Sequence, residues 1–242
     1  MCDLGSTLLS QNFTVPSIMH STSHVLTVQE RAALVDKFLA ERFPTPEISL
    51  NFKDHYTLLI AVLLSARCTD AKVNQIAPKL FAIADNPYDM IKLSVEQIQK
   101  IIQPCGLSPA KAKGIFELSH ILVNQYQGQV PRTFEELEEL PAIGHKSASV
   151  VMAQAFNEPA FPVDTHIHRL AQMWGLTQGK TRTQSEIDLK SLFPPSRWNS
   201  LHLQMIHYGR EICPARGCDR LRSPLCQACF PNNKIAFKSV RS

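Results

Sequence analysis

One lysine stands just after a glycine turn, in the stretch LPAIGHKSASVVMAQAF at 140–156. The apolar residues that follow Lys146 recur at helical spacing, so the lysine is predicted to lie at the start of a helix. Backbone N–H groups at a helix start have no helical partner and, together with the helix dipole, they attract phosphate. Gly144 would let a phosphate come close. Lys146 is thus a candidate for chemistry beside a bound phosphate, with an ordinary surface lysine as the alternative.

An aspartate ends an apolar run in the stretch FPVDTHIHRL at 161–170. Helical spacing begins directly after it, with Thr165 and His166. Aspartate is favoured at the N-cap position, so Asp164 could simply cap this helix. It could also act as a carboxylate in a reaction, and the two interpretations do not exclude each other.

Four of the seven cysteines gather within 17 residues in the pattern C-x4-C-x7-C-x2-C. Four soft ligands this close together suggest a thiolate-bound iron–sulfur cluster or a structural zinc ion. The first 26 residues contain no Lys or Arg, which argues against a secretory signal or an Arg-rich transit peptide. A cytoplasmic location with reduced cysteines and no disulfide framework is expected. The predicted ligands are Cys213, Cys218, Cys226 and Cys229.

The elements that would position these residues are helices. Apolar residues recur every three or four positions in 26–43, 55–84 and 94–106, and prolines with short polar stretches separate these segments. The stretch 133–136 reads as a capping box, which predicts a helix from Phe134 to about Leu140. A turn with Pro141 and Gly144 would follow, and then the helix opened by Lys146. The fold is predicted to be all-α.

Composition sets loose bounds on a partner. The 242 residues are 44% hydrophobic and 19% charged, and no apolar run approaches the roughly 20 residues that span a bilayer. The net charge is +4, and the segment 209–242 carries seven Lys or Arg against two acidic residues. A polyanionic partner is permitted, and no membrane passage is expected.

Taken in order, LPAIGHKSASVV, PVDTH and the cysteine group resemble the endonuclease III family of the helix-hairpin-helix DNA glycosylase superfamily. The family is also matched by two further stretches, LLIAVLLSARCTDAKVN at 58–74 and HYGREIC at 207–213. The resemblance thus spans about 26–229. It implies two helical lobes flanking a DNA-binding cleft. The expected division is an extension at 1–24, a six-helix barrel at 48–158 with the helix-hairpin-helix at about 134–153, a cluster domain from 25–47 plus 159–230, and a tail at 231–242.

The resemblance also implies a reaction. Lys146 would be the nucleophile and Asp164 the carboxylate facing it, in an enzyme that removes oxidised pyrimidines from double-stranded DNA. A damaged base must leave the stack to be reached. Asp164 would stabilise the positive charge left on the sugar, and Lys146 would attack C1′ to give a Schiff base, after which β-elimination cleaves 3′ to the abasic site. A monomer acting on damaged or abasic DNA is expected.

The same resemblance implies further contacts with DNA, and this sequence departs from the family's pattern in two places. Leu107 matches a wedge residue that fills the stack, and Arg67 stands where the family commonly has a glutamine. The family's cysteine spacing is C-x6-C-x2-C-x5-C, so the ligand assignment here rests on proximity, with a 4Fe-4S cluster preferred over zinc. The residues expected to contact DNA are Arg67, Leu107, Gly144, His145, Arg216, Arg220 and Arg222.

Two rival functions stay open at this stage. A monofunctional glycosylase of the adenine-mismatch type would share the hairpin and the cluster, but it lacks a lysine at this position and carries an extra C-terminal domain. A DNA-binding module would grip phosphate with the hairpin and a metal knuckle. Such a module has no need of Asp164.

Overall fold

The computed structural model describes residues 25–219 and 223–230, and every regular element within these ranges is a helix. The all-α prediction is confirmed. The predicted extension at 1–24, the tail at 231–242, Arg220 and Arg222 lie outside the described residues. None of the described helices has the length and hydrophobicity needed to cross a bilayer. The helices are α1 Val28–Arg42, α2 His55–Ser65, α3 Asp70–Phe81, α4 Pro87–Met90, α5 Val95–Ile102, α6 Ser108–Tyr126, α7 Phe134–Glu139, α8 His145–Ala155, α9 Thr165–Met173, α10 Arg182–Leu192, α11 Pro195–Glu211 and α12 Pro224–Cys229.

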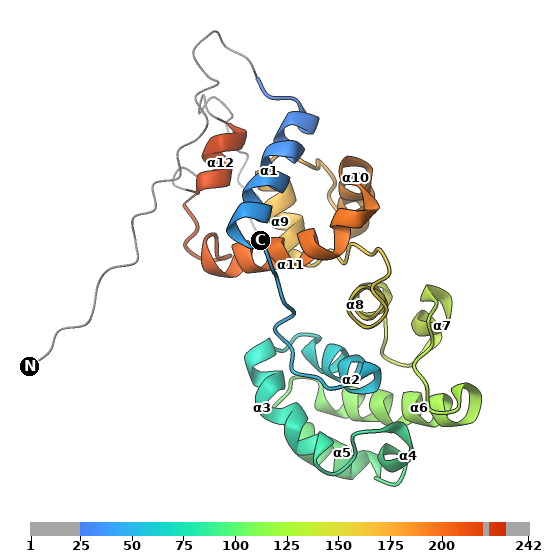
Figure 1. Cartoon of the computed structure of the whole chain (residues 1–242). Helices are drawn as coiled ribbons and strands as arrows, with labels where there is room; N and C mark the ends of the chain where they lie inside the picture. Colours follow the sequence, from blue (N-terminus) through green and yellow to red (C-terminus); the bar gives the residue numbers. More distant parts are fainter. Residues whose placement is uncertain (1–24, 220–222, 231–242) are drawn as a thin grey trace, which may run out of the picture.

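The helices form two lobes, each with its own hydrophobic core (Figure 1). The core of one lobe draws its buried side chains from 50–160, centred on α2, which is buried along nearly its whole length. The core of the other draws them from 32–43 and 161–229, around Trp174 and Tyr208, whose rings meet edge to face at 5.2 Å. The chain therefore begins in the lobe around Trp174 and Tyr208, forms the lobe centred on α2, and then returns to the lobe in which it began. The domain limits given above stay predictions.

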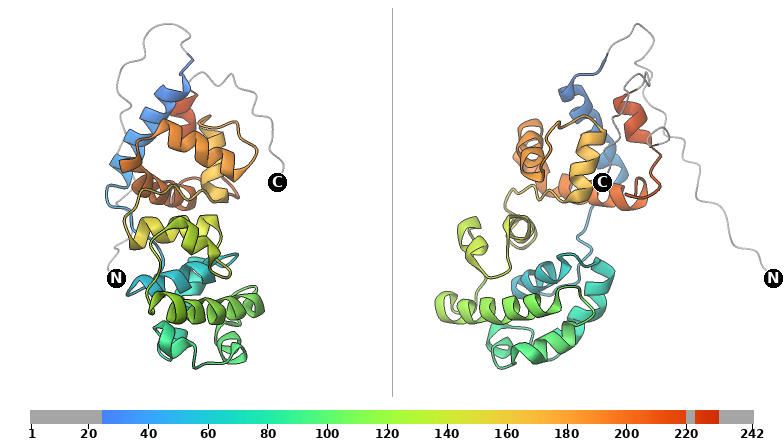
Figure 2. Two further views of the ribbon diagram at one scale, coloured as in Figure 1. Left: turned by 90° about the vertical axis from the view of Figure 1, so that its right-hand side faces the viewer. Right: turned by 180° about the vertical axis from the view of Figure 1, so that it is seen from behind.

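The two lobes are joined by two chain crossings, after α1 and after α8 (Figures 1 and 2). Polar contacts reinforce the joint. Arg210 of α11 lies 2.6 Å from the Asp70 carboxylate of α3 and donates to the Ser49 hydroxyl at 2.8 Å. These bonds connect α11 to the lobe that holds α3.

The hairpin between α7 and α8 departs in detail from the expected turn. Thr133 caps α7 by accepting from the Glu136 N–H, but the Glu136 carboxylate accepts from the Thr133 hydroxyl at 2.7 Å and does not complete a capping box. The left-handed residue of the turn is Ala142, with φ 64°, and Gly144 has φ −105°. Helix α8 begins at His145, one residue before the predicted start. The backbone angles at position 144 therefore do not require a glycine.

Candidate active site

Lys146 and Asp164 lie at the starts of two successive helices. Lys146 is the second residue of α8, its side chain is exposed, and its Nζ makes no hydrogen bond or ion pair within the described residues. Asp164 is the N-cap of α9 and accepts from the Ile167 N–H at 2.9 Å through Oδ1. The N-cap interpretation of Asp164 is confirmed, and only one of its carboxylate oxygens is engaged in capping.

A buried histidine connects these two residues. His202 of α11 is 2% exposed and interacts electrostatically with both the Lys146 ammonium and the Asp164 carboxylate. The two charged groups therefore lie within electrostatic range of one buried ring, although 18 positions separate them in the chain. His202 was not predicted from the sequence. Its position among the apolar residues of α11 was the available signal, since Leu201 and Met205 on either side are buried core residues.

The backbone at the start of α8 is open for a ligand. Gly144 caps the helix without any side-chain hydrogen bond, and a Cβ added to it would meet no atom within 4 Å. The N–H groups of the first turn of α8 accordingly have no capping side chain, and the helix dipole places positive charge there. This arrangement can accept one phosphate of a nucleic acid backbone beside Lys146.

His145 is held by two carboxylates. Its Nδ1 donates to Glu138 of α7 at 2.7 Å, and its Nε2 donates to Glu186 of α10 at 3.1 Å. These hydrogen bonds raise the pKa of His145, the bond to Glu138 most strongly. The imidazole ring therefore ties the hairpin to α10 in the other lobe. Both ring nitrogens of His145 are engaged by carboxylates, so its backbone N–H is the group left for the expected contact with DNA.

The tie at His145 predicts a pH-dependent stability. Because the folded pKa is raised, the stabilisation is complete below the unfolded value near 6.5 and is lost as the pH rises through the folded value. The ring is half-exposed, so we expect His145→Gln to lower the melting temperature by about 1–3 °C at about pH 6 and hardly at all at about pH 9. Thermal unfolding at the two pH values checks this. His120→Gln is the control, because the His120 ring contacts Phe116 and, among the residues that the structure describes, no carboxylate.

Two neighbouring loops present Arg67 and Leu107. Both residues have left-handed backbone angles, with φ 53° and 64°, and the Leu107 side chain is 53% exposed. A Cβ added to Gly106 would lie 3.5 Å from the Arg67 carbonyl oxygen, so the loops are in contact. An exposed apolar side chain beside an exposed cation can enter a base stack and approach an orphan base.

A buried lysine supports these loops and was not predicted from the sequence. Lys111 is 4% exposed, and its ammonium donates to the Leu64 carbonyl at the end of α2 at 2.9 Å. Burial lowers its pKa. Burial, and next the neighbouring Cys68 thiol, raise the pKa of the Cys105 thiol to about 11, and these two cysteines flank the two loops. The sequence signal was the position of Lys111 on an apolar helix face, four residues before buried Ile115.

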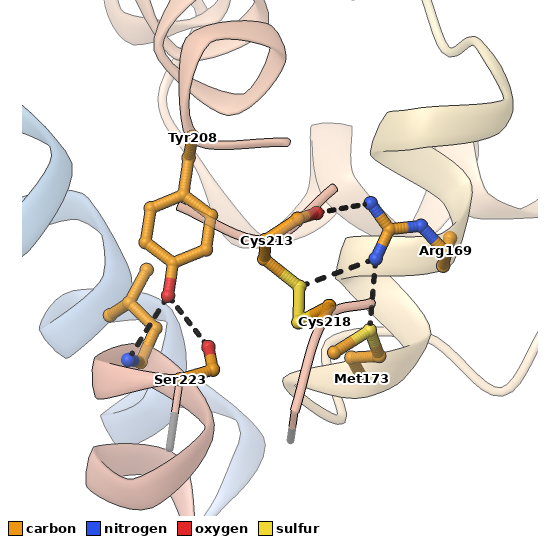
Figure 3. The surroundings of a disulfide bond; sticks show 7 residues. Arg169, Met173, Tyr208, Cys213, Cys218 and Ser223 are labelled. Carbon is orange, nitrogen blue, oxygen red and sulfur yellow. Dashed lines mark hydrogen bonds between the residues drawn. A yellow bond between two sulfur atoms is a disulfide. The ribbon is translucent and has the colours of Figure 1, made fainter. Parts of the chain in front are cut away.

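The cysteine group differs from expectation. Cys213 and Cys218 form a disulfide bond (Figure 3), contrary to the expected absence of disulfides. Cys226 and Cys229 are buried and form no disulfide within the described residues. A short loop brings the first pair together, since only four residues separate them. Within the described ranges, no three His, Cys, Asp or Glu side chains are grouped so that they could hold a metal ion. The predicted set of four metal ligands stays a prediction.

The surroundings of the cysteines combine cations, which favour the thiolate form, with burial, which disfavours it. Arg169 donates to the Cys213 sulfur at 3.3 Å and to its carbonyl oxygen at 2.7 Å (Figure 3). Burial raises the pKa of the Cys229 thiol to about 12, while the Arg31 cation opposes that rise. Cys213, Cys226 and Cys229 belong to one buried core, and Cys218 packs against it. The donor chemistry fits a thiolate-bound cluster once the Cys213–Cys218 bond is reduced.

Comparison with known proteins identifies the family. Residues 60–195 match the HhH-GPD superfamily base excision DNA repair proteins. The endonuclease III of Escherichia coli is 38% identical over 200 residues, which are 83% of this chain and 92% of that protein. The endonuclease III of Bacillus subtilis is 35% identical over 217 residues, 89% of this chain and 99% of that protein. The chain belongs to the endonuclease III family. It is a base excision repair enzyme, a DNA glycosylase and AP lyase, as predicted.

Two solved endonuclease III structures extend the likeness to the fold. A non-covalent endonuclease III–DNA complex matches with a TM-score of 0.80 at 36% identity, over 85% of this chain and 96% of that chain. A trapped endonuclease III–DNA covalent intermediate matches with a TM-score of 0.79 at 36% identity, over 83% of this chain and 94% of that chain. The two-lobed helical architecture is therefore that of endonuclease III.

Proposed function

We propose that this endonuclease III removes oxidised pyrimidines from double-stranded DNA and cleaves 3′ to the abasic site through a Schiff base on Lys146. The observation that carries the proposal is the placement of Lys146 and Asp164. Each stands at the start of a helix within electrostatic range of the same buried histidine. A lone phosphate-binding hairpin would need the backbone of α8 but not a carboxylate opposite it.

The steps assigned to this chain follow from that placement. With the lesion extruded from the stack, loss of the base leaves positive charge on the sugar, and the second oxygen of the Asp164 carboxylate is available to stabilise it. The Lys146 amine, once deprotonated, attacks C1′. The imine that forms acidifies the C2′ proton, its removal breaks the bond to the 3′ phosphate, and hydrolysis of the imine returns the lysine.

DNA binding would use several groups around this pair. The first N–H groups of α8, at Gly144 and His145, would hold a phosphate. Leu107 would fill the stack beside the extruded nucleotide, and Arg67 would occupy the gap that the nucleotide leaves and hydrogen-bond the orphan base. The exposed Arg216 would add a phosphate contact that weakens with salt. A DNA partner is supported by the two DNA-bound relatives, and monomeric action and a cytoplasmic location belong to the same proposal.

The cysteine group belongs to the proposal as a structural centre. Reduced Cys213, Cys218, Cys226 and Cys229 would hold a 4Fe-4S cluster, with zinc as the alternative. Bound there, the cluster would cross-link the loop after α11 to α12. The proposal assigns it no part in base removal or strand cleavage.

An Asp164→Asn variant tests the assigned carboxylate. Asparagine is also favoured at the N-cap and keeps an oxygen for the Ile167 N–H, so α9 retains its cap and only the charge is lost. We expect base release from a duplex with one oxidised pyrimidine to slow by about 100- to 1,000-fold, the effect of removing one transition-state stabiliser. Single-turnover base release measures it. Release at the parent rate would end the assignment of Asp164.

A further inference from the structure

Two side chains of helix α11 hydrogen-bond to the segment that precedes Asp164. Residues 157–164 form no helix, and two side chains of α11 hold their backbone. The Asn199 amide oxygen accepts from the Ala160 N–H at 3.0 Å, and the His202 Nδ1 lies 2.9 Å from the Pro162 carbonyl oxygen. Asn199 and His202 are three residues apart, so they lie on one face of α11. The last of these bonds is two residues before Asp164.

The bond to Pro162 fixes the protonation of the His202 ring. A carbonyl oxygen only accepts, so Nδ1 carries the hydrogen. Burial, and next the Lys146 ammonium, lower the pKa of His202 to about 4, with Arg210 acting in the same direction and Asp164 against it. The ring is therefore neutral near pH 7, and its Nε2 has no hydrogen in this tautomer. Nε2 makes no hydrogen bond to the part of the chain that the structure describes.

We propose that His202 is the positioning residue for Asp164: its Nδ1–H holds the Pro162 carbonyl and so sets how the carboxylate faces Lys146. The inference rests on the proposed roles of Asp164 and Lys146. This role requires the His202 ring to remain uncharged, because an imidazolium near the sugar would oppose the positive charge that develops there. A misplacement of about 1 Å in such a site costs on the order of 100-fold in rate.

Three substitutions separate the hydrogen bond from simple packing. Asparagine places an amide N–H where the imidazole carries Nδ1, glutamine places it near the position of Nε2, and leucine has none. We expect His202→Asn to release an oxidised pyrimidine within about threefold of the parent rate. His202→Gln and His202→Leu should be about 10- to 100-fold slower, with unchanged affinity for the duplex. If the leucine variant does not fold, the asparagine and glutamine pair decides alone.

Each variant is tested in three ways: single-turnover base release, binding of the same duplex, and borohydride trapping on a ready-made abasic duplex. Trapping depends on Lys146 and should stay within about threefold of the parent in all three variants. His168→Leu is the matched control, because His168 bonds Ser185 at 2.7 Å in the same lobe and does not hold the 160–162 segment. We expect it to release the base at the parent rate.

The outcomes separate this inference from the proposed function. A parent protein that neither releases the base nor forms an adduct overturns the proposed function. With an active parent, base release at the parent rate in the glutamine variant overturns the role of His202 alone. The same follows if asparagine is as slow as glutamine, because the restored N–H would then have no effect.

Discussion

The Lys146→Gln variant is expected to form no covalent adduct with an abasic duplex under borohydride, whereas the parent protein forms one. The adduct arises when borohydride reduces a Schiff base, and only an amine can form that imine. Glutamine keeps a polar side chain that is one atom shorter, but it has no amine to act as the nucleophile. Strand cleavage at the abasic site should fall by about 10⁴-fold or more, the scale seen when a catalytic nucleophile is removed.

The structure makes this variant a clean test. The Lys146 side chain is exposed and its Nζ makes no hydrogen bond or ion pair within the described residues, so its replacement should not disturb folding or the neighbouring helices. Lys113→Gln is the matched control, since Lys113 is an exposed lysine whose ammonium lies 3.7 Å from Glu117. An adduct that persists in Lys146→Gln would place the nucleophile elsewhere. A parent that binds the duplex but gives no adduct would indicate a monofunctional glycosylase or a binding module.

The sequence predicted those features that depend on neighbours in the chain. The apolar spacing after Lys146 and the aspartate before Thr165 specify two helix starts, and both are found within one residue of the predicted positions. Helix starts are set by local capping and by the first apolar turn, which a single sequence displays. The candidate pair could therefore be placed on the right elements before the lobes were known.

Features that depend on contacts between the lobes could not be predicted in this way. Glu186 and His202 approach the hairpin from α10 and α11, and no local pattern links them to His145 or Asp164. The left-handed residue of the turn is Ala142, which packs closely against α6: a Cβ on Gly114 would lie 2.7 Å from that of Ala142. Tertiary packing decides such angles, and it overrides the preference for glycine at a left-handed position.

The state of the cysteine group gives the second large effect. If the four cysteines hold a 4Fe-4S cluster, anaerobically purified protein should contain about four iron atoms per chain and show visible charge-transfer absorbance. Cys229→Ser should abolish both signals and lower the melting temperature by about 5–20 °C, the range expected when a cross-link worth roughly 2–5 kcal/mol is lost. Iron content, the absorbance spectrum and thermal unfolding are the measurements.

Cys229→Ser also distinguishes the cluster from the disulfide, because it leaves Cys213 and Cys218 free to pair. Cys105→Ser is the control for placing a hydroxyl in a buried thiol site, since Cys105 is as buried as Cys229 but lies in the other core. A parent without iron that binds one zinc ion would support the zinc alternative. A parent without any metal, whose melting temperature falls by about 4–8 °C on reduction, would identify the Cys213–Cys218 disulfide as the cross-link of this lobe and end the cluster assignment.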